Sequence, residues 1–285
     1  MHIAIIGLGL IGGSIGLALK QSKKRQYRIT GYARKQNTAA KALKTGAVDS
    51  AASSLKDAVE HANIVLIATP VLAIKDIFIE IAPHLPVGCI VTDAGSTKSQ
   101  VCRWAKDLLP AHVNFIGGHP MAGKETAGIE SADHALFENR IYCLVYDPAT
   151  AKFAVKAVTD MAHDLGAKVL TLDAADHDLY VAGISHLPFL MSVALTGVTS
   201  ASPQWKAMSE LASSGYRDMT RLTAGSTEMY RDICLTNHEH ISLWIDRYIE
   251  ELRRIQHYID SNDPAVQDIF DNAKEQRRRW WRDKK

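Results

Sequence analysis

Four polar stretches of the sequence carry side chains that could move a proton or hold a carboxylate. Ser96 lies in DAGSTK, His119 in FIGGHPMAG and His186 in SHLP, while Arg217 and Arg221 share GYRDMTRLTAG. Neutral imidazole accepts a proton near neutral pH, and arginine binds a carboxylate through two parallel hydrogen bonds. Each residue alone also has a structural interpretation. Ser96 could cap a helix, His186 could be a core histidine and Arg221 could be a surface cation.

His119 stands among glycines and directly before a proline. Gly117, Gly118 and Gly123 are interpreted as letting this segment lie close to a cofactor and a substrate. Pro120 is interpreted as limiting the movement of His119. The setting therefore favours a base aimed at a substrate over a packed core side chain.

A glycine pattern near the N-terminus predicts a dinucleotide site. GLGLIGGS has the pattern G-x-G-x-x-G and lies between a predicted strand and a predicted helix. The first glycine permits a tight turn, the second lets the backbone approach a pyrophosphate, and the third allows close helix packing. The helix N-terminus attracts the phosphates. The predicted contacts are Gly7, Gly9, Leu10, Ile11 and Gly12, and the alternative is a purely structural turn.

The end of the second predicted strand indicates which dinucleotide is bound. NAD-binding versions of this fold place an acidic residue there, which bonds the ribose 2′-hydroxyl. Here position 33 is alanine, and Arg34 and Lys35 follow. The cations favour a 2′-phosphate, so we predict NADP, with Thr38 as a further contact. The alternative is that they are solvated loop charges. Thr69 and Pro70, which end NIVLIATP, are also predicted to line the cofactor.

These residues follow an alternation of apolar runs and amphipathic stretches. The predicted strands are HIAIIGL, YRITGYA, NIVLIATP, CIVTDAGS, VNFIGGHP, IYCLVYD and AKVLTLD. Buried strands separated by helices predict an α/β fold with a parallel sheet covered on both faces. From AADHDLYVAGISHLPFLMSVAL onward the pattern is helical. We predict a Rossmann-type dinucleotide-binding domain at residues 1–167 and an all-helical domain at residues 168–285.

Composition and charge argue against several other classes of protein. The net charge is +2, so neither a nucleic acid nor a membrane surface is predicted as a partner. Beyond the glycine-spaced N-terminus, we expect no segment apolar enough to span a bilayer, and we predict a cytoplasmic protein. The four cysteines lack C-x-x-C spacing, so reduced thiols and no metal site are predicted. The tail EQRRRWWRDKK is interpreted as a helix end or a partner contact rather than a nucleic-acid arm.

The order of the motifs resembles one enzyme family. G-x-G-x-x-G, D-x-G-S-x-K, G-G-H-P-M-A-G, S-H-L-P and G-Y-R-D-M-T-R follow one another between Ile3 and about Asn237. This order is similar to that of the prephenate/arogenate dehydrogenases of tyrosine biosynthesis. The resemblance implies a Rossmann domain followed by a helical domain that forms a homodimer. It also implies oxidative decarboxylation of arogenate or prephenate, with hydride transfer to NADP.

The resemblance also implies the catalytic roles. In the family, the histidine of H-P-M-A-G, here His119, contacts the ring hydroxyl, and the serine of D-x-G-S, here Ser96, assists it. Hydride leaves C4 of the ring while the imidazole takes the hydroxyl proton. The ketone that forms is conjugated to C1, so carbon dioxide leaves as the ring becomes aromatic.

The resemblance to the family also implies which residues contact the substrate. His186 of S-H-L-P lines the substrate pocket, and Arg221 binds the ring carboxylate. Arg217, in the same motif as Arg221, is a further predicted contact. Some relatives carry a tryptophan nine residues after the arginine; this chain has Tyr230 there, and it is included among the predicted contacts.

Two other functions are compatible with parts of the sequence. A β-hydroxyacid dehydrogenase has a similar architecture but relies on a catalytic lysine on an interdomain helix, and no convincing candidate is present. A catalytically silent NADP-binding sensor is the second, but retention of Ser96, His119, His186 and Arg221 argues against it. Prephenate carries a keto group where arogenate carries an ammonium group. The NADP features favour arogenate, and prephenate is the alternative.

Overall fold

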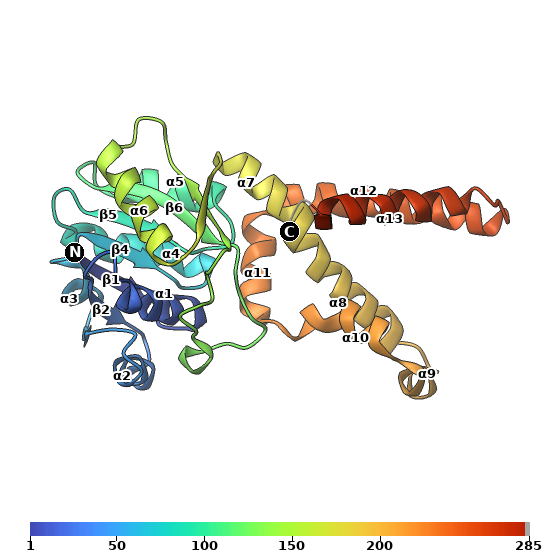
Figure 1. The fold of residues 1–285 in the computed structure, drawn as a ribbon, viewed down its shortest axis with the longest axis horizontal. Helices are drawn as coiled ribbons and strands as arrows, with labels where there is room; N and C mark the ends of the chain where they lie inside the picture. Colours follow the sequence, from blue (N-terminus) through green and yellow to red (C-terminus); the bar gives the residue numbers. More distant parts are fainter. Residues whose placement is uncertain (283–285) are drawn as a thin grey trace. The chain divides into compact units, whose positions relative to one another are not determined.

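The structure of this chain, a computed structural model, describes residues 1–282. The contacts divide the chain into two compact units, one over Met1–His238 and one that begins at Glu239. The first unit contains a sheet with its covering helices and a further set of helices (Figure 1). The second unit consists of nearly all of α12 and of α13.

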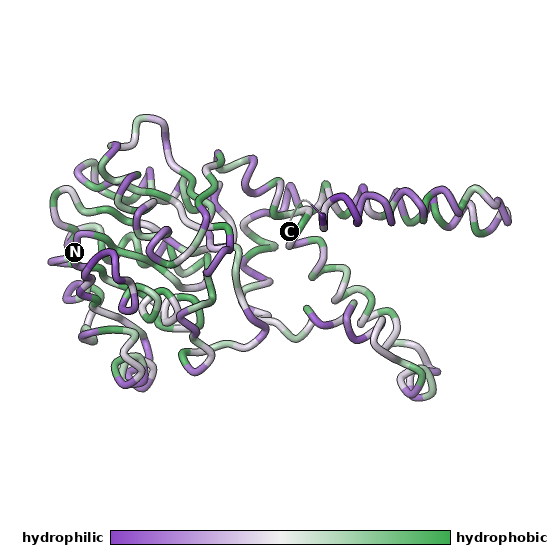
Figure 2. The backbone as a smooth tube through the Cα atoms, in the orientation of Figure 1, coloured by the Kyte–Doolittle hydropathy of each residue, from purple (hydrophilic) through white to green (hydrophobic). Residues whose placement is uncertain are grey.

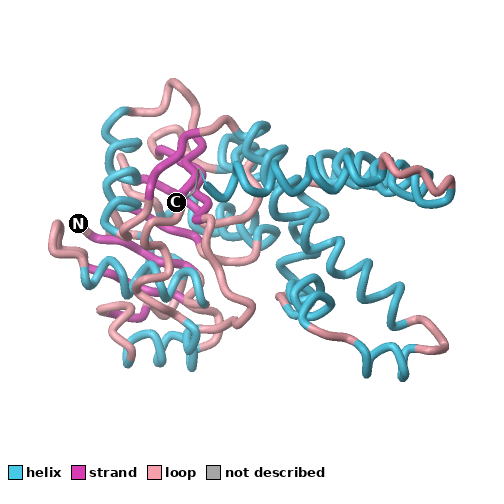
Figure 3. Tube along the Cα trace, turned by 45° about the vertical axis from the view of Figure 1, so that its right-hand side comes forward, coloured by secondary structure: helices cyan, strands magenta, loops and turns pink. Residues whose placement is uncertain are grey.

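The first unit begins with alternating strands and helices, and it ends in helices alone (Figure 3). The alternating part comprises β1 His2–Ile6, α1 Leu10–Gln21, β2 Arg28–Tyr32, α2 Gln36–Lys44, β3 Ser50–Ala51, α3 Leu55–Val59, β4 Ile64–Ile67, α4 Val71–Ile81, η1 Ala82–His84, β5 Ile90–Asp93, α5 Ser99–Leu108, β6 Asn114–Pro120, η2 Ile129–Ser131, β7 Ile141–Val145, α6 Lys152–Asp164 and β8 Lys168–Thr171. The helical part comprises α7 Ala174–Val181, η3 Ala182–His186, α8 Leu187–Ser200, α9 Trp205–Leu211, α10 Ser214–Thr220, η4 Arg221–Ala224 and α11 Thr227–Thr236. They are followed by α12 His238–Asp260 and α13 Val266–Arg282.

The sheet has eight strands in the order β3-β2-β1-β4-β5-β6-β7-β8. Neighbours from β3 through β6 pair in parallel, which confirms the predicted Rossmann-type sheet. β7 runs antiparallel to β6, and β8 is parallel to β7, so these two strands depart from the prediction. The physical reason lies in the connection from β6 to β7, which contains only the short turn η2. A parallel return would need a crossover, usually a helix, whereas an antiparallel one does not.

Two hydrophobic cores cover the faces of the sheet. Alternate residues of β1 point to opposite sides, with Ile3 and Ile5 in one core and Ala4 and Ile6 in the other. Buried side chains of α1, α2 and α6 complete the first core, and those of α3, α4 and α5 complete the second. Figure 2 shows the central strands in hydrophobic colours, as expected for strands buried on both faces. The sheet therefore fixes the positions of the strand ends, where the site lies.

One segment contradicts the expectation that no further stretch is apolar enough to span a bilayer. The helical run Ala174–Ser200 reaches a mean hydropathy of 1.6, so by length and composition alone it could cross a membrane. The same run carries the buried polar side chains of His177, Asp178, His186 and Ser192. Such groups are costly in lipid, which argues for a helix of a folded domain. A cytoplasmic location stays a prediction.

The predicted domain boundary coincides with the start of β8, and the basic tail belongs to α13. The division into residues 1–167 and 168–285 stays a prediction, and β8, which begins at Lys168, pairs with β7 in the sheet. α13 includes the basic tail as far as Arg282, and hydrophilic colours predominate along it (Figure 2). The last three residues of the tail lie outside the described residues.

Candidate functional site

The glycine turn after β1 has the geometry of a phosphate-binding loop. Gly7 has a φ of +96°, and its N–H donates to the Tyr32 carbonyl at 2.9 Å. A Cβ at Gly12 would overlap the Gly7 carbonyl oxygen, so helix α1 can pack this closely only on a glycine. Gly9 caps α1 and has open space where its Cβ would be. This gap at a helix N-terminus fits the pyrophosphate of a dinucleotide.

The other predicted cofactor residues fall into two groups. Arg34 and Lys35 are exposed just before α2, and Thr38 lies in the first turn of that helix. Thr69 and Pro70 follow β4 at the carboxyl edge of the sheet. The Thr69 hydroxyl is buried, and among residues 1–282 it has no hydrogen-bond partner, so it is free to bond a ligand there.

A cleft of about 830 Å³ joins the glycine turn to the helical part of the first unit. Its volume suits a small ligand together with part of a cofactor. The predicted residues that line it are Gly9, Leu10, Ile11, Thr69, Pro70, Ser96, His119, Arg221 and Tyr230. The predicted residues that do not line it are Gly7, Gly12, Arg34, Lys35, Thr38, His186 and Arg217.

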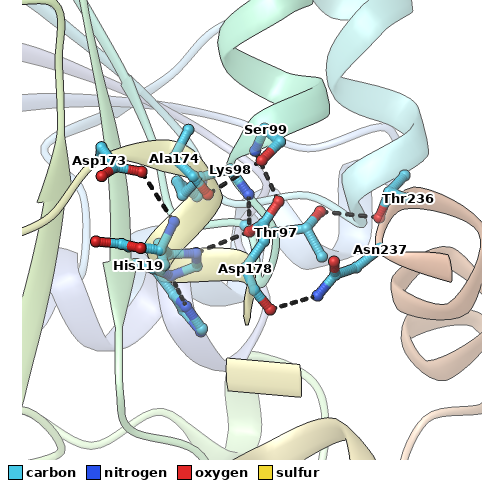
Figure 4. A network of polar contacts seen from close by, with 12 residues as sticks. Thr97, Lys98, Ser99, His119, Asp173, Ala174, Asp178, Thr236 and Asn237 are labelled. Carbon is cyan, nitrogen blue, oxygen red and sulfur yellow. Dashed lines mark hydrogen bonds and ion pairs between the residues drawn. The ribbon is translucent and has the colours of Figure 1, made fainter. Parts of the chain in front are cut away.

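A row of buried polar side chains runs from the cleft into the protein (Figure 4). His119, at the end of β6, lines the cleft and is only 9% exposed. Its Nδ1 lies 2.9 Å from Nε2 of His177 on α7, and Nδ1 of His177 lies 2.8 Å from Oδ1 of Asp178. Asp178 also accepts the backbone N–H groups of Lys98 and Ser99, at 2.7 and 2.8 Å. These contacts connect the end of β6 to the segment between β5 and α5.

The proton positions in this row follow from Asp178. An ionised carboxylate only accepts hydrogen bonds, so Nδ1 of His177 carries the proton that it donates. A His177 ring that holds only this proton has a bare Nε2, which accepts from Nδ1–H of His119. His119 is left with a bare Nε2, and His119 lines the cleft. The arrangement makes His119 a hydrogen-bond acceptor toward a ligand, as a general base requires.

The pKa shifts indicate the charge states of His119 and Asp178. Burial lowers the pKa of His119 well below its ordinary value, and His177, Lys98 and His186 lower it further. For Asp178, burial by itself would raise the pKa, but the hydrogen bonds from His177, Lys98 and Ser99 outweigh it and lower the pKa. His119 is therefore neutral and Asp178 ionised at neutral pH.

Lys98 and Asp93 form a fully buried ion pair beneath the row. Asp93 also accepts the N–H of Gly118 at 3.1 Å, next to His119 in the chain. A Cβ at Gly117 would lie 3.1 Å from Cδ of Lys98, and one at Gly118 would overlap the Asp93 carbonyl oxygen. The glycines at 117 and 118 thus allow close packing against Lys98 and the Asp93 backbone. Their role in admitting cofactor and substrate stays a prediction.

His186 lies behind the cleft rather than in its lining. It is 1% exposed, and its Nδ1 is 3.3 Å from the side-chain nitrogen of Asn237. Burial lowers the pKa of His186 to about 4; Asp178 opposes the shift and His177 adds to it. Ser185 and Phe189, its neighbours on the same helical run, do line the cleft.

The arginines and Tyr230 have partners of their own. Arg221 forms an ion pair with Glu125 of the loop after β6, and both line the cleft. Arg217 is exposed and paired with the adjacent Asp218, away from the cleft lining. Tyr230 stacks on Phe189 with ring centroids 4.0 Å apart, and its hydroxyl donates to the Leu222 carbonyl at 2.7 Å. Arg217 and Tyr230 as substrate contacts stay predictions.

Sequence reasoning gave no role to His177, Asp178, Lys98 or Asn237. An adjacent His-Asp pair in a helical stretch was a usable signal for the first two. Nothing in the local pattern marked Asn237, because its partners lie 51 and 59 residues away. Within the described residues, no group of three or more His, Cys, Asp or Glu side chains is placed to hold a metal ion.

Comparison with known proteins gives two family matches. The family model described as prephenate dehydrogenase, nucleotide-binding domain, matches residues 15–171. The model described as prephenate dehydrogenase, dimerization domain, matches residues 173–271. Together they cover most of the cleft, from α1 to α11.

Individual relatives agree with these matches. Prephenate dehydrogenase of Bacillus subtilis is 36% identical over 263 residues, which covers 92% of this chain and 71% of the relative. The crystal structure of Synechocystis arogenate dehydrogenase is 31% identical with a TM-score of 0.83, covering 98% of this chain and 100% of that one. Prephenate dehydrogenase from A. aeolicus, in complex with hydroxyphenyl propionate and NAD+, is 26% identical with a TM-score of 0.90 and covers 98% of each chain.

Proposed function

Because the chain belongs to the prephenate dehydrogenase family, we propose that it oxidatively decarboxylates arogenate, prephenate or both. The products are tyrosine and 4-hydroxyphenylpyruvate respectively, and the hydride goes to a nicotinamide dinucleotide, NADP in preference to NAD. One observation carries the proposal: a single cleft is lined by Gly9 of the glycine turn, by His119 and by Arg221. The family membership leaves the β-hydroxyacid dehydrogenase alternative without support.

His119 is the proposed base. The nicotinamide, when bound, accepts the hydride from C4 of the ring. Nε2 of His119 takes the proton of the C4 hydroxyl as the ketone forms. The hydrogen bond to His177, and through it the charge of Asp178, stabilises the resulting imidazolium. Loss of carbon dioxide from C1 then makes the ring aromatic.

Arg221 is the proposed anchor of the ring carboxylate. Its present partner is the partly exposed Glu125 carboxylate. Binding would exchange this carboxylate for that of the substrate, and arginine can hold the latter through two parallel hydrogen bonds. Ser96 lines the same cleft and lies on a loop held by Thr97, whose hydroxyl is 2.8 Å from that of Thr236. A hydroxyl on a fixed loop can assist His119 at the ring oxygen.

Preference for NADP rests on the loop after β2. Arg34 and Lys35 are exposed there, and within the described residues neither forms an ion pair. Both are available to a 2′-phosphate, which would lie beyond a strand end that lacks the usual acid. We expect the double variant Arg34→Ser, Lys35→Ser to raise the KM for NADP at least about tenfold and to leave the KM for NAD within about twofold. An equal change for both cofactors would contradict the preference.

The test of the function is a set of initial rates with arogenate and prephenate, each with NADP and NAD. Turnover of arogenate with NADP, and of no other pair, would support an NADP-specific arogenate dehydrogenase. Comparable turnover of prephenate would make the enzyme a broad cyclohexadienyl dehydrogenase. Binding of NADP without turnover of either substrate would contradict the proposal and favour the catalytically silent sensor. His119→Asn is the matched control, since it should lose turnover and keep cofactor affinity.

A homodimer is proposed from the helical part of the first unit. Val198 on α8 is 76% exposed and Leu211 on α9 is 85% exposed, an arrangement that a second copy would cover. We expect Val198→Asp to shift the mass measured by light scattering from dimer toward monomer. Val87→Asp, at a site 86% exposed beside the sheet, is the matched control and should leave the mass unchanged. A monomeric wild-type chain would refute the dimer without affecting the proposed reaction.

A further inference from the structure

Asn237 lies in the buried part of the site, beside Asp178 and His186. It follows α11, is 4% exposed, and its side-chain nitrogen lies 2.8 Å from the backbone carbonyl of Asp178. The same nitrogen lies 3.3 Å from Nδ1 of His186. The other ring nitrogen of His186, Nε2, is buried, and among residues 1–282 it has no hydrogen-bond partner.

The orientation of the Asn237 side-chain amide follows from its contact with the backbone carbonyl of Asp178. A backbone carbonyl can only accept a hydrogen bond, so the amide group that faces Asp178 must be the NH2 and not the oxygen. The NH2 group has two hydrogens, and the second is available to His186. Nδ1 of His186 must then be the acceptor, because a protonated Nδ1 would set two donors against each other.

We propose that Asn237 is a positioning residue that holds His186 as the tautomer with its proton on Nε2. His186 then offers a hydrogen-bond donor, while His119 offers an acceptor, although both are neutral imidazoles. The burial that lowers the pKa of His186 to about 4 keeps it neutral, so the choice is between two tautomers. A buried donor without a partner is rare outside functional sites.

The expected partner of Nε2–H is an acceptor oxygen of the substrate, and this step rests on the proposed function. His186 lies between Ser185 and residues of α8 that line the cleft, so a small movement of its helical turn would bring Nε2 to a ligand. That turn is a π-helix, Ala182–His186, a form that is frequent at functional sites. A carboxylate or carbonyl oxygen is the chemistry that a fixed neutral donor recognises.

The test is nitrogen NMR of the histidine rings in the ligand-free protein, in which a bare and a protonated nitrogen are well separated. The His186 signals are assigned by their loss in His186→Gln. We expect wild-type His186 to have a bare Nδ1 and a protonated Nε2 near pH 7. A protonated Nδ1 in the wild type would overturn the proposal, whatever the variants do. Because no substrate is present, this outcome is independent of the proposed reaction.

Asn237→Asp is the diagnostic variant, since a carboxylate only accepts and would draw the His186 proton to Nδ1. The Asp178 carbonyl keeps the N–H of Ala182, so it is not left unpaired. We expect the tautomer to reverse and kcat/KM to fall about tenfold or more. Asn139→Asp is the matched control: it makes the same exchange at an exposed position outside the cleft lining. An unchanged tautomer in Asn237→Asp, or an equal loss of kcat/KM in Asn139→Asp, would refute the positioning role.

Discussion

Asp178→Asn removes a charge from the polar row and keeps its shape. The amide oxygen can still accept from His177 and from the Lys98 N–H, which both bond Oδ1 in the wild type. The amide nitrogen would then face the Ser99 N–H, a donor against a donor. The orientation of His119 should survive, so the variant isolates the contribution of the charge.

The magnitude follows from the geometry of the row. Two hydrogen bonds, of 2.8 and 2.9 Å, separate Asp178 from His177 and His177 from His119. With about 2 Å for the imidazole between them, the charge lies about 8 Å from His119, and at an effective dielectric of about 20 the attraction is about 2 kcal/mol. That equals about 1.5 pKa units, or a factor of up to about 30 in kcat/KM.

The assay is kcat/KM against pH with the preferred substrate and cofactor. The wild-type profile should stay flat as pH falls through 6.5, because the pKa of His119 lies well below that value. In Asp178→Asn the plateau should drop by up to about 30-fold, and the acidic limb should move to lower pH, since loss of a negative charge disfavours the imidazolium.

The control is Asp173→Asn, the same exchange at the N-cap of α7. Asp173 bonds only the helix start, where asparagine caps equally well, so its rates should match the wild type. Chemical denaturation of both variants separates activity from the stability that Asp178→Asn loses with the Ser99 bond, about 1–3 kcal/mol. A folded Asp178→Asn enzyme with wild-type rates would refute the reasoning that the charge reaches His119.

Two further predictions concern packing and acid stability. Gly118→Ala puts a methyl group against the Asp93 carbonyl oxygen and 2.9 Å from the Tyr142 ring. It should cost about 1–3 kcal/mol in denaturant unfolding, whereas Gly123→Ala, which meets nothing within 4 Å, should cost little; equal costs would contradict the packing argument. For His186 the folded pKa of about 4 lies below the ordinary 6.5, so the unfolded chain binds the proton first. Stability should therefore fall as pH drops below about 6.5 and level off near pH 4, a loss of about 3 kcal/mol that His186→Gln would not show.

Most of the sheet and the glycine turn could be predicted because each depends on the pattern of a short segment of sequence. The strands β1 and β4 come from continuous apolar runs, residues 3–6 and 64–67, and a glycine or a proline follows each run within three residues. The glycine turn was predictable since Gly7 needs a positive φ, which glycine adopts without strain. Ser96 and His119 follow or end strands, so the parallel arrangement alone brings them to one edge of the sheet.

The direction of β7 and the membrane-like hydropathy of Ala174–Ser200 were not predicted correctly. An apolar strand has the same composition whichever way it runs, and only the length and content of the connection reveal its direction. Likewise, hydropathy averages over a helix and does not register that its few polar residues face a buried network. The direction of β7 thus depends on the connection that precedes it, whereas the burial of the polar residues in Ala174–Ser200 depends on segments far away in the chain.

The sequence by itself determined which residues could act: a base at His119, a carboxylate anchor at Arg221 and a phosphate turn at Gly7. These depend on residue type, spacing and backbone conformation, which are properties of short segments. Only the tertiary structure decided how the protons are arranged, because His119 meets His177 58 residues further along the chain. A proton's position on an imidazole depends on which partner faces each nitrogen, and folding alone brings those partners together.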